Sequence, residues 1–168
     1  MQKKKVILIA VLLVSAIVAC VLWVNKENSK QDNADKFVRV VDGHFQRGGK
    51  PYYYVGTNFW YGAILGSEGR GGNRQRLCQE LDDMKAMGID NLRILVGSDG
   101  KEGVLTKVEP TLQQAPGVYN DTILAGLDYL LMEMGKREMV AVLYLNNSWE
   151  WSGGYGFYLE HAGEGVAP

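Results

Sequence analysis

The stretch that most constrains the fold of this chain runs from Met139 to Gly154. It begins with seven consecutive apolar or aromatic residues, Met139–Leu145, which follow a helical pattern and predict a strand buried on both faces of a parallel sheet. The apolar run stops at Asn146, and amides and indoles follow as far as Trp151. In open α/β sheets and (β/α)8 barrels, ligands bind at the carboxyl ends of the strands, where such a loop begins. Because pyranose rings combine apolar faces with a rim of hydroxyls, amides beside indoles favour a carbohydrate over a phosphate or a metal.

The amino-terminal residues have the layout of an export segment. Lys3–Lys5 precede an uninterrupted apolar run from Val6 to Val24, and residues 25–36 are polar and charged. We therefore predict a signal peptide or membrane anchor over residues 1–24 and a linker over residues 25–36. A third interpretation is a lipoprotein, because Ile17–Cys20 resembles a bacterial lipobox and Cys20 would then carry the lipid. All three interpretations predict export to the periplasm, cell surface or medium, with the membrane as a partner through this segment or a lipid on Cys20.

Charge and cysteine content exclude several classes of partner. The chain has 18 basic and 19 acidic residues, so no basic surface for nucleic acid is expected. Its two cysteines, Cys20 and Cys78, are too few for a disulfide framework or a cysteine metal cluster. We expect no metal site.

The folded part is expected over residues 37–168, with strands and helices in alternation. Turn residues and periodicity predict a β-ribbon that turns at Asp42-Gly43 and at residues 48–50, followed by a strand over 51–56. After a flexible glycine-rich loop over 66–72, they predict a helix that runs from its cap at Asn73 to Gly88, and then a strand over 91–96. After a polar connection over 97–119, they predict a helix from Asn120 or Asp121 through Met134, the strand over 139–145 and a short helix over 157–161. Such alternation requires parallel strands with right-handed crossovers. An open doubly wound sheet and a (β/α)8 barrel both satisfy it, and the long loops after each strand favour the barrel.

Three segments at the predicted strand ends carry a resemblance to a known family. Residues 56–61 (Gly-Thr-Asn-Phe-Trp-Tyr), 87–94 (Met-Gly-Ile-Asp-Asn-Leu-Arg-Ile) and 145–154 (Leu-Asn-Asn-Ser-Trp-Glu-Trp-Ser-Gly-Gly) resemble the first three strand ends of glycoside hydrolase family 5, and within it the endo-β-1,4-mannanases. The resemblance runs from about residue 37 to the last residue. It implies an α/β (β/α)8 TIM barrel with its first three βα units here. Since a complete barrel takes about 250 residues, we expect an amino-terminal piece of a longer protein.

Arg93 is the most informative single residue. A guanidinium in the middle of an otherwise apolar strand is costly to bury alone, so it is expected to face carboxylates in the barrel mouth. The resemblance implies the same, because an arginine at this position in the family lies beside the catalytic nucleophile and helps to keep it ionised. The alternative is an outward arginine that pairs with a helix.

The resemblance also assigns substrate-binding residues. It implies that Trp60 or Tyr61 stacks on a sugar, and the family's usual order of tyrosine then tryptophan is reversed here, so which ring stacks stays open. Asn146 or Asn147 would give a supporting hydrogen bond, and Trp149 would form a wall of the cleft. For Trp151, core packing and sugar contact are both open.

The catalytic carboxylates are not expected in this chain. Retaining glycosidases use two carboxyl groups about 5 Å apart, and the family places them after the fourth and seventh strands, the first in an Asn-Glu pair that this chain lacks. Glu150 is therefore expected to be a rim residue. The resemblance implies that the complete protein cleaves internal β-1,4 bonds of mannan-type polysaccharides with retention and without a cofactor, and that this chain alone is inactive. Two alternatives remain: a cellulase-like family 5 endo-β-1,4-glucanase, and a non-catalytic carbohydrate-binding protein anchored at the surface.

Overall fold

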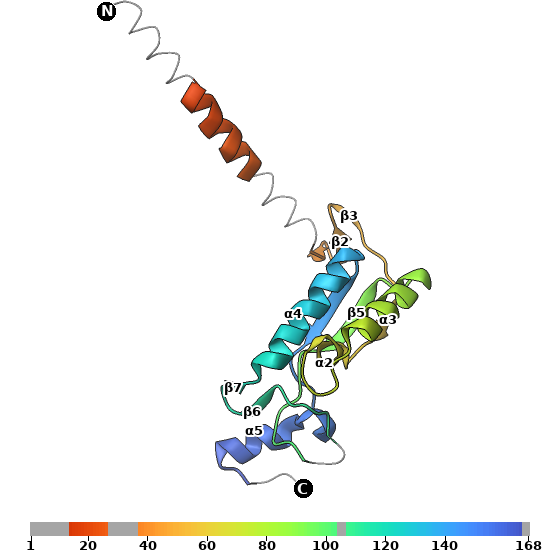
Figure 1. Ribbon diagram of the computed structural model, residues 1–168, viewed down its shortest axis with the longest axis vertical. Helices are drawn as coiled ribbons and strands as arrows, with labels where there is room; N and C mark the ends of the chain where they lie inside the picture. Colours follow the sequence, from red (N-terminus) through yellow and green to blue (C-terminus); the bar gives the residue numbers. More distant parts are fainter. Residues whose placement is uncertain (1–13, 27–36, 104–106, 166–168) are drawn as a thin grey trace, which may run out of the picture. The chain divides into compact units, whose positions relative to one another are not determined.

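The computed structural model describes residues 14–26, 37–103 and 107–165, in two compact units divided between Tyr53 and Tyr54 (Figure 1). Residues 14–26 are helical, and Cys20 is exposed there as a free thiol. Within the described ranges, no helix has the length and hydropathy needed to cross a membrane. Most of the predicted export segment and linker, residues 1–13 and 27–36, lies outside these ranges.

The first unit contains a three-stranded antiparallel sheet of β1 (Arg39–Val41), β2 (His44–Arg47) and β3 (Lys50–Pro51). Its first turn is the predicted Asp42-Gly43 pair, where both residues have positive φ, 49° and 76°. Pro51 was expected to open the next strand, and this is wrong, because it pairs with Gln46 in β3. Proline has no N–H to donate, so an edge strand of this kind can hold it.

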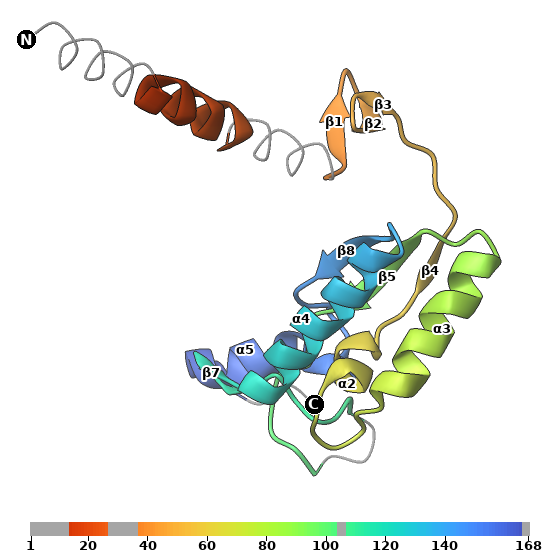
Figure 2. The ribbon, with the colours of Figure 1, turned by 45° about the horizontal axis from the view of Figure 1, so that its top comes forward.

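The second unit is built on a parallel sheet in the order β4 (Gly56–Asn58), β5 (Asn91–Leu95), β8 (Val140–Tyr144). The register places Asn58 beside Arg93 and Arg93 beside Val142. Helices α2 (Gly62–Gly66) and α3 (Arg74–Ala86) follow β4, α4 (Asp121–Lys136) follows β5, and α5 (Gly154–Ala162) follows β8. The predicted alternation of parallel strands and helices is therefore observed, with three βα units (Figure 2).

The two long helices begin where the sequence predicted. Asn73 caps α3 by accepting a hydrogen bond from the Arg76 N–H at 2.9 Å, and Asn120 caps α4 through the Thr122 N–H at 3.0 Å. Each cap satisfies an N–H that has no partner inside the helix. The apolar faces of these helices and the buried side of β5 share one core, whose most buried members are Leu77, Leu81, Leu92, Ile94 and Leu130.

Several short elements differ from the expectation. Helix α2 occupies residues that were not assigned, and its last residue is the first of the predicted glycine-rich loop. The connection over 97–119 contains a hairpin of β6 (Gln113–Ala115) and β7 (Val118–Tyr119), turned at Gly117 with φ 77°. After β8, the 3-10 helix η1 (Glu150–Ser152) precedes α5, which starts three residues before the predicted helix. Elements of two to five residues are too short for periodicity to identify them.

Helices α2 and α4 cross at two glycines. A Cβ on Gly66 would lie 2.2 Å from the Gly126 carbonyl oxygen, and a Cβ on Gly126 would lie 2.2 Å from the Ala63 carbonyl oxygen. The backbones therefore touch directly, and this contact fixes α2 next to the loop that leaves β4.

A charged cluster joins α3 to the end of α4. The Glu133 side chain, only 8% exposed, accepts hydrogen bonds from Lys136 Nζ at 2.6 Å and Arg137 Nη1 at 2.8 Å. The Arg137 guanidinium also donates to Asp82 Oδ1 at 2.7 Å and to the Cys78 carbonyl. The hydrogen bonds from Lys136 and Arg137 hold the pKa of Glu133 below its ordinary value, so the folded state favours the ionised carboxylate.

We predict that Glu133→Gln lowers the free energy of unfolding of the full-length protein by about 2 kcal/mol at neutral pH, because it leaves a mostly buried guanidinium short of a charged partner. A lowered folded-state pKa adds stability that is complete above the unfolded pKa and is lost as the pH falls through the folded pKa. The variant should therefore lose less stability than wild type between pH 5 and pH 3. Urea unfolding at several pH values measures both effects. Asp128→Asn, on an exposed position of α4, is the control and should change stability by less than about 0.5 kcal/mol.

Candidate functional site

Of the predicted site residues, Arg93 lies within β5, and the others lie in the segments that leave the carboxyl ends of β4 and β8. Trp60 and Tyr61 follow β4, and Asn146, Asn147 and Trp149 follow β8. Because the three strands are parallel and adjacent, these segments emerge at one edge of the sheet.

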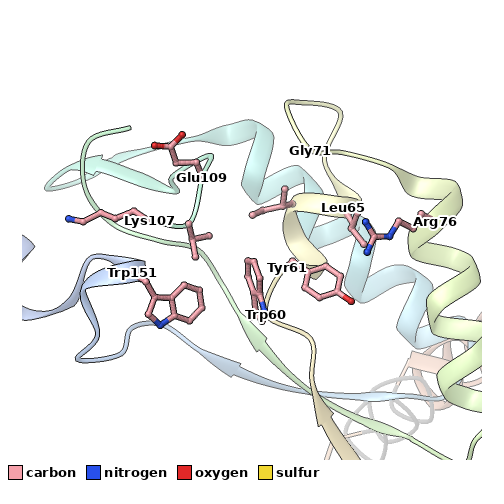
Figure 3. Close-up of a pocket in the computed structure, with 10 residues that line it drawn as sticks. Trp60, Tyr61, Leu65, Gly71, Arg76, Lys107, Glu109 and Trp151 are labelled. Carbon is pink, nitrogen blue, oxygen red and sulfur yellow. The ribbon is translucent and has the colours of Figure 1, made fainter. Parts of the chain in front are cut away.

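A cavity of about 680 Å³ opens at this edge (Figure 3). Its lining residues are Trp60, Tyr61, Ile64, Leu65, Gly71, Arg76, Lys107, Val108, Glu109 and Trp151. The Trp60 and Trp151 rings meet edge to face, with centroids 5.4 Å apart, and Trp60 stays 40% exposed. This pair joins the segment after β4 to the segment after β8, and it leaves aromatic surface on the cavity wall.

Tyr61 is held by contacts within the fold more than Trp60 is. Its hydroxyl donates to Glu80 Oε2 at 2.9 Å, and its ring packs on the buried Phe59 ring with the two centroids 4.8 Å apart. Burial and the Glu80 carboxylate raise the pKa of Tyr61, so the hydroxyl remains a donor at neutral pH. Of the two neighbouring rings, Trp60 is therefore the one that has no hydrogen bond to the described part of the chain.

Arg93 lies in the middle of β5, on the face opposite to the core. Its neighbours Leu92 and Ile94 are fully buried, and alternation along the strand turns Arg93 the other way, where it is exposed. The guanidinium lies 3.8 Å above the centre of the Tyr144 ring, and Nη1 donates to Asn58 Oδ1 at 3.4 Å. No carboxylate pairs with it among the described residues, so the expected acidic partner is not in this part of the chain.

Arg93 belongs to a second, smaller cavity. This hollow of about 320 Å³ is lined by Tyr54, Gly56, Thr57, Asn58, Asn91, Arg93 and Val142. The structure therefore does not bring Arg93 into the same cavity as Trp60.

The two asparagines after β8 have different surroundings. Asn146 Nδ2 donates to Asp99 Oδ2 at 3.0 Å and to the Tyr158 hydroxyl at 2.9 Å. Asn147 Oδ1 accepts from the Trp149 N–H and from Ser152 Oγ, both at 2.8 Å. Asn147 therefore closes the turn that leads into η1, a structural role that its sequence position did not reveal.

The cavity around Trp60 is not lined by Asn146, Asn147 or Trp149, and Trp149 is 70% exposed. Glu150 is also exposed, with its Oε2 4.0 Å from Lys107 Nζ. Across the described ranges, no group of three or more histidine, cysteine or acidic side chains could hold a metal ion.

Sequence reasoning missed Asp99, Tyr144 and Tyr158. Asp99 is only 5% exposed and contacts segments 14 to 59 residues away. Its place just after β5 was the available signal, because a carboxylate at the carboxyl end of a buried strand is a candidate site residue.

Comparison with known proteins identifies the class. Residues 35–167 match the family model described as GH family 5 beta-mannosidase-like, so this chain belongs to glycoside hydrolase family 5. Its solved neighbours are (β/α)8 barrel proteins, and the β4-β5-β8 sheet with its helices corresponds to part of that barrel.

Individual relatives are named as mannosidases or as mannan endo-1,4-beta-mannosidases. The glycoside hydrolase family 5 mannosidase of Rhizomucor miehei is 38% identical, with a TM-score of 0.74 over 79% of this chain and 33% of that chain. A mutant of that mannosidase, solved in complex with mannosyl-fructose, gives a TM-score of 0.73 at 38% identity over 77% of this chain and 32% of that one. Mannan endo-1,4-beta-mannosidase 1 of Oryza sativa subsp. japonica is 28% identical over 94% of this chain and 35% of the relative. The chain thus spans about a third of the length of the relatives it matches.

Proposed function

We propose that the protein containing this chain is an endo-acting mannanase that hydrolyses internal β-1,4-mannosidic bonds in mannan-type polysaccharides. The observation that supports this most is the aromatic cavity at the carboxyl edge of the parallel sheet, in a chain that belongs to a family with mannosidase members. The rings of Trp60 and Trp151 offer flat apolar surface, and Lys107, Glu109 and Arg76 offer polar groups around it. This combination fits a pyranose, whose C–H face stacks on a ring while its hydroxyls form hydrogen bonds.

Trp60 is proposed as the stacking residue of the two neighbouring rings, because the Tyr61 hydroxyl is bound to Glu80 and its ring packs on Phe59. Asn146 is proposed to contact the substrate, whereas Asn147 supports it by closing the turn before η1. Trp149 is proposed to form an outer wall of the cleft, in keeping with its high exposure.

The mechanism is proposed to be retaining, with two glutamates supplied by the part of the enzyme outside this chain. One carboxylate attacks the anomeric carbon to form a glycosyl-enzyme, and the other protonates the leaving oxygen and then activates water. Arg93 would lie beside the nucleophile, where its positive charge keeps that carboxylate ionised. The 168-residue chain by itself is accordingly proposed to be inactive.

Export is proposed from the amino-terminal sequence, through a signal peptide, a membrane anchor or a lipid on Cys20. The Cys20 thiol is exposed on a helix, where an enzyme that transfers a lipid to it would have access. An exported location suits an enzyme whose substrate is a polymer outside the cell.

Hydrolysis assays of the full-length protein test the proposed function. We expect galactomannan to lose viscosity quickly and to release manno-oligosaccharides, because an endo-acting enzyme cuts inside the polymer. The chain of 168 residues should release none. Cleavage of carboxymethylcellulose alone would instead identify a cellulase-like β-glucanase. Binding to mannan without release of sugar would identify a non-catalytic carbohydrate-binding protein.

A further inference from the structure

The Asp99 carboxylate is a buried junction between three segments at the sheet edge. Its Oδ2 accepts hydrogen bonds from the Tyr158 hydroxyl at 2.8 Å and from Asn146 Nδ2 at 3.0 Å, and its Oδ1 accepts from Gln113 Nε2 at 3.2 Å. These donors come from α5, from the segment after β8 and from β6. Burying a carboxylate costs desolvation free energy unless hydrogen-bond donors surround it, and the three hydrogen bonds offset that cost here.

The junction determines which half of the Asn146 amide is left for a ligand. A side-chain amide nitrogen has two hydrogens. Asn146 uses one on Asp99 Oδ2 and the other on the Tyr158 oxygen, 2.9 Å away. Both oxygens of Asp99 accept hydrogen bonds, so the nitrogen must face Asp99, and Asn146 Oδ1 is the atom without a partner in the described part of the chain.

Tyr158 makes this orientation unambiguous. Burial, followed by the hydrogen bond to Asp99, raises the pKa of the Tyr158 hydroxyl, so it stays protonated at neutral pH. Its single hydrogen is donated to Asp99, and towards Asn146 it can therefore only accept.

The loop after β8 packs directly on this junction. The Asp99 N–H donates to the Ser152 carbonyl at 3.0 Å, and a Cβ on Gly153 would lie 2.7 Å from both the Cβ and the carbonyl oxygen of Asp99. Gly153 also has φ 108°, which side chains rarely adopt. Backbone contact as close as this holds Asp99 in one place relative to Asn146.

Asn147 presents the opposite half of its amide. Its Oδ1 is occupied by the Trp149 N–H and Ser152 Oγ, which leaves Nδ2 as the group without a described partner. Two consecutive asparagines therefore offer one acceptor and one donor.

We propose that Asp99 and Tyr158 are positioning residues that make Asn146 an obligate hydrogen-bond acceptor, so that the carboxyl end of β8 presents an acceptor that selects a hydroxyl group of the substrate. The ligand class, a saccharide hydroxyl, rests on the proposed function. The geometry of the junction does not depend on it.

A double-mutant cycle in the full-length protein tests the selection step. Tyr158→Phe and Asp99→Asn are each expected to lower kcat/KM on manno-oligosaccharides about tenfold, the worth of one misoriented hydrogen bond. In an Asn146→Ala background, Tyr158→Phe should lower it less than about twofold, because the amide that it orients is gone. Tyr155→Phe, on an exposed position of α5, is the control and should have no effect. An equal loss with and without Asn146 would overturn the proposal.

Exchange of side-chain amide hydrogens tests the orientation without any activity. With isotope-labelled asparagine, nuclear magnetic resonance should show both Asn146 Nδ2 hydrogens exchanging with water more slowly than those of Asn147. Tyr158→Phe should remove most of that difference. Equal exchange in the wild-type protein would overturn the proposal even if mannan is hydrolysed. Protected Asn146 hydrogens in a protein that does not cleave mannan would contradict the proposed function alone.

Discussion

Gly126→Ala is expected to destabilise the full-length protein by about 3 kcal/mol or more, the upper range for overpacking a core. The added Cβ would lie 2.2 Å from the Ala63 carbonyl oxygen and 2.7 Å from the Ser67 nitrogen. Both atoms belong to the backbone, so no change of rotamer can relieve the clash, and α2 must move away from α4. Urea unfolding followed by circular dichroism measures the loss.

Gly135→Ala is the matched control, because it makes the same change in the same helix. Nothing lies within 4 Å of a Cβ at Gly135, and the position is exposed. Alanine is the better helix former, so this variant should gain about 0.5 to 1 kcal/mol. If the two substitutions changed stability by similar amounts, the close crossing of α2 and α4 would be wrong.

The α2–α4 contact also matters for the cavity. Helix α2 begins directly after Trp60 and Tyr61, and Ile64 and Leu65 of α2 line the cavity. A shift of α2 would move this wall. We therefore expect any folded Gly126→Ala protein to bind manno-oligosaccharides more weakly, whereas Gly135→Ala should bind as wild type does.

The long helices could be predicted because each has a periodic apolar pattern and a capping residue, as in the helix that begins after Asn120. The strand Val140–Tyr144 could be predicted from its unbroken apolar run, but its expected burial on both faces is wrong for the described part of the chain. There β8 is an edge strand, and Val142 and Leu143 are 46% and 41% exposed. Helix α2 and the β6–β7 hairpin could not be predicted, because they have five residues or fewer per element. Their positions depend on tertiary contacts, such as the approach of Gly66 to Gly126.

The candidate site shows the same division. The sequence shows which residues follow a strand and which charged residue interrupts one, so Trp60, Asn146 and Arg93 could be named from sequence. The contacts of each side chain could not be predicted from the sequence. The binding of Tyr61 to Glu80 and of Asn146 to Asp99 joins residues that are 19 and 47 positions apart, and only folding brings them together.

Arg93→Ala is expected to lower kcat on mannan about 100-fold to 1000-fold, the usual cost of removing an electrostatic group from an active site. In the proposed mechanism the guanidinium keeps the nucleophile ionised. Its loss should raise the pKa of that carboxylate, and the acidic limb of the pH–rate profile should then move to higher pH. Arg93→Lys keeps the charge but not the planar group that lies on the Tyr144 ring and donates to Asn58, so we expect an intermediate loss.

Two further measurements distinguish this electrostatic role of Arg93 from a structural role: the stability of Arg93→Ala, and the activity of a variant that lacks a different cation. Arg93 is exposed in the described part of the chain and has no ion pair there, so Arg93→Ala should leave the unfolding midpoint nearly unchanged. Lys85→Ala removes an exposed cation from the last turn of α3 and should leave both kcat and the pH profile unaltered. An acidic limb that stays in place in Arg93→Ala, or a loss of stability as large as that of Gly126→Ala, would show that Arg93 supports the sheet. The loss of a neighbouring guanidinium raises the pKa of a carboxylate. An unchanged acidic limb would therefore mean that other groups keep the nucleophile ionised.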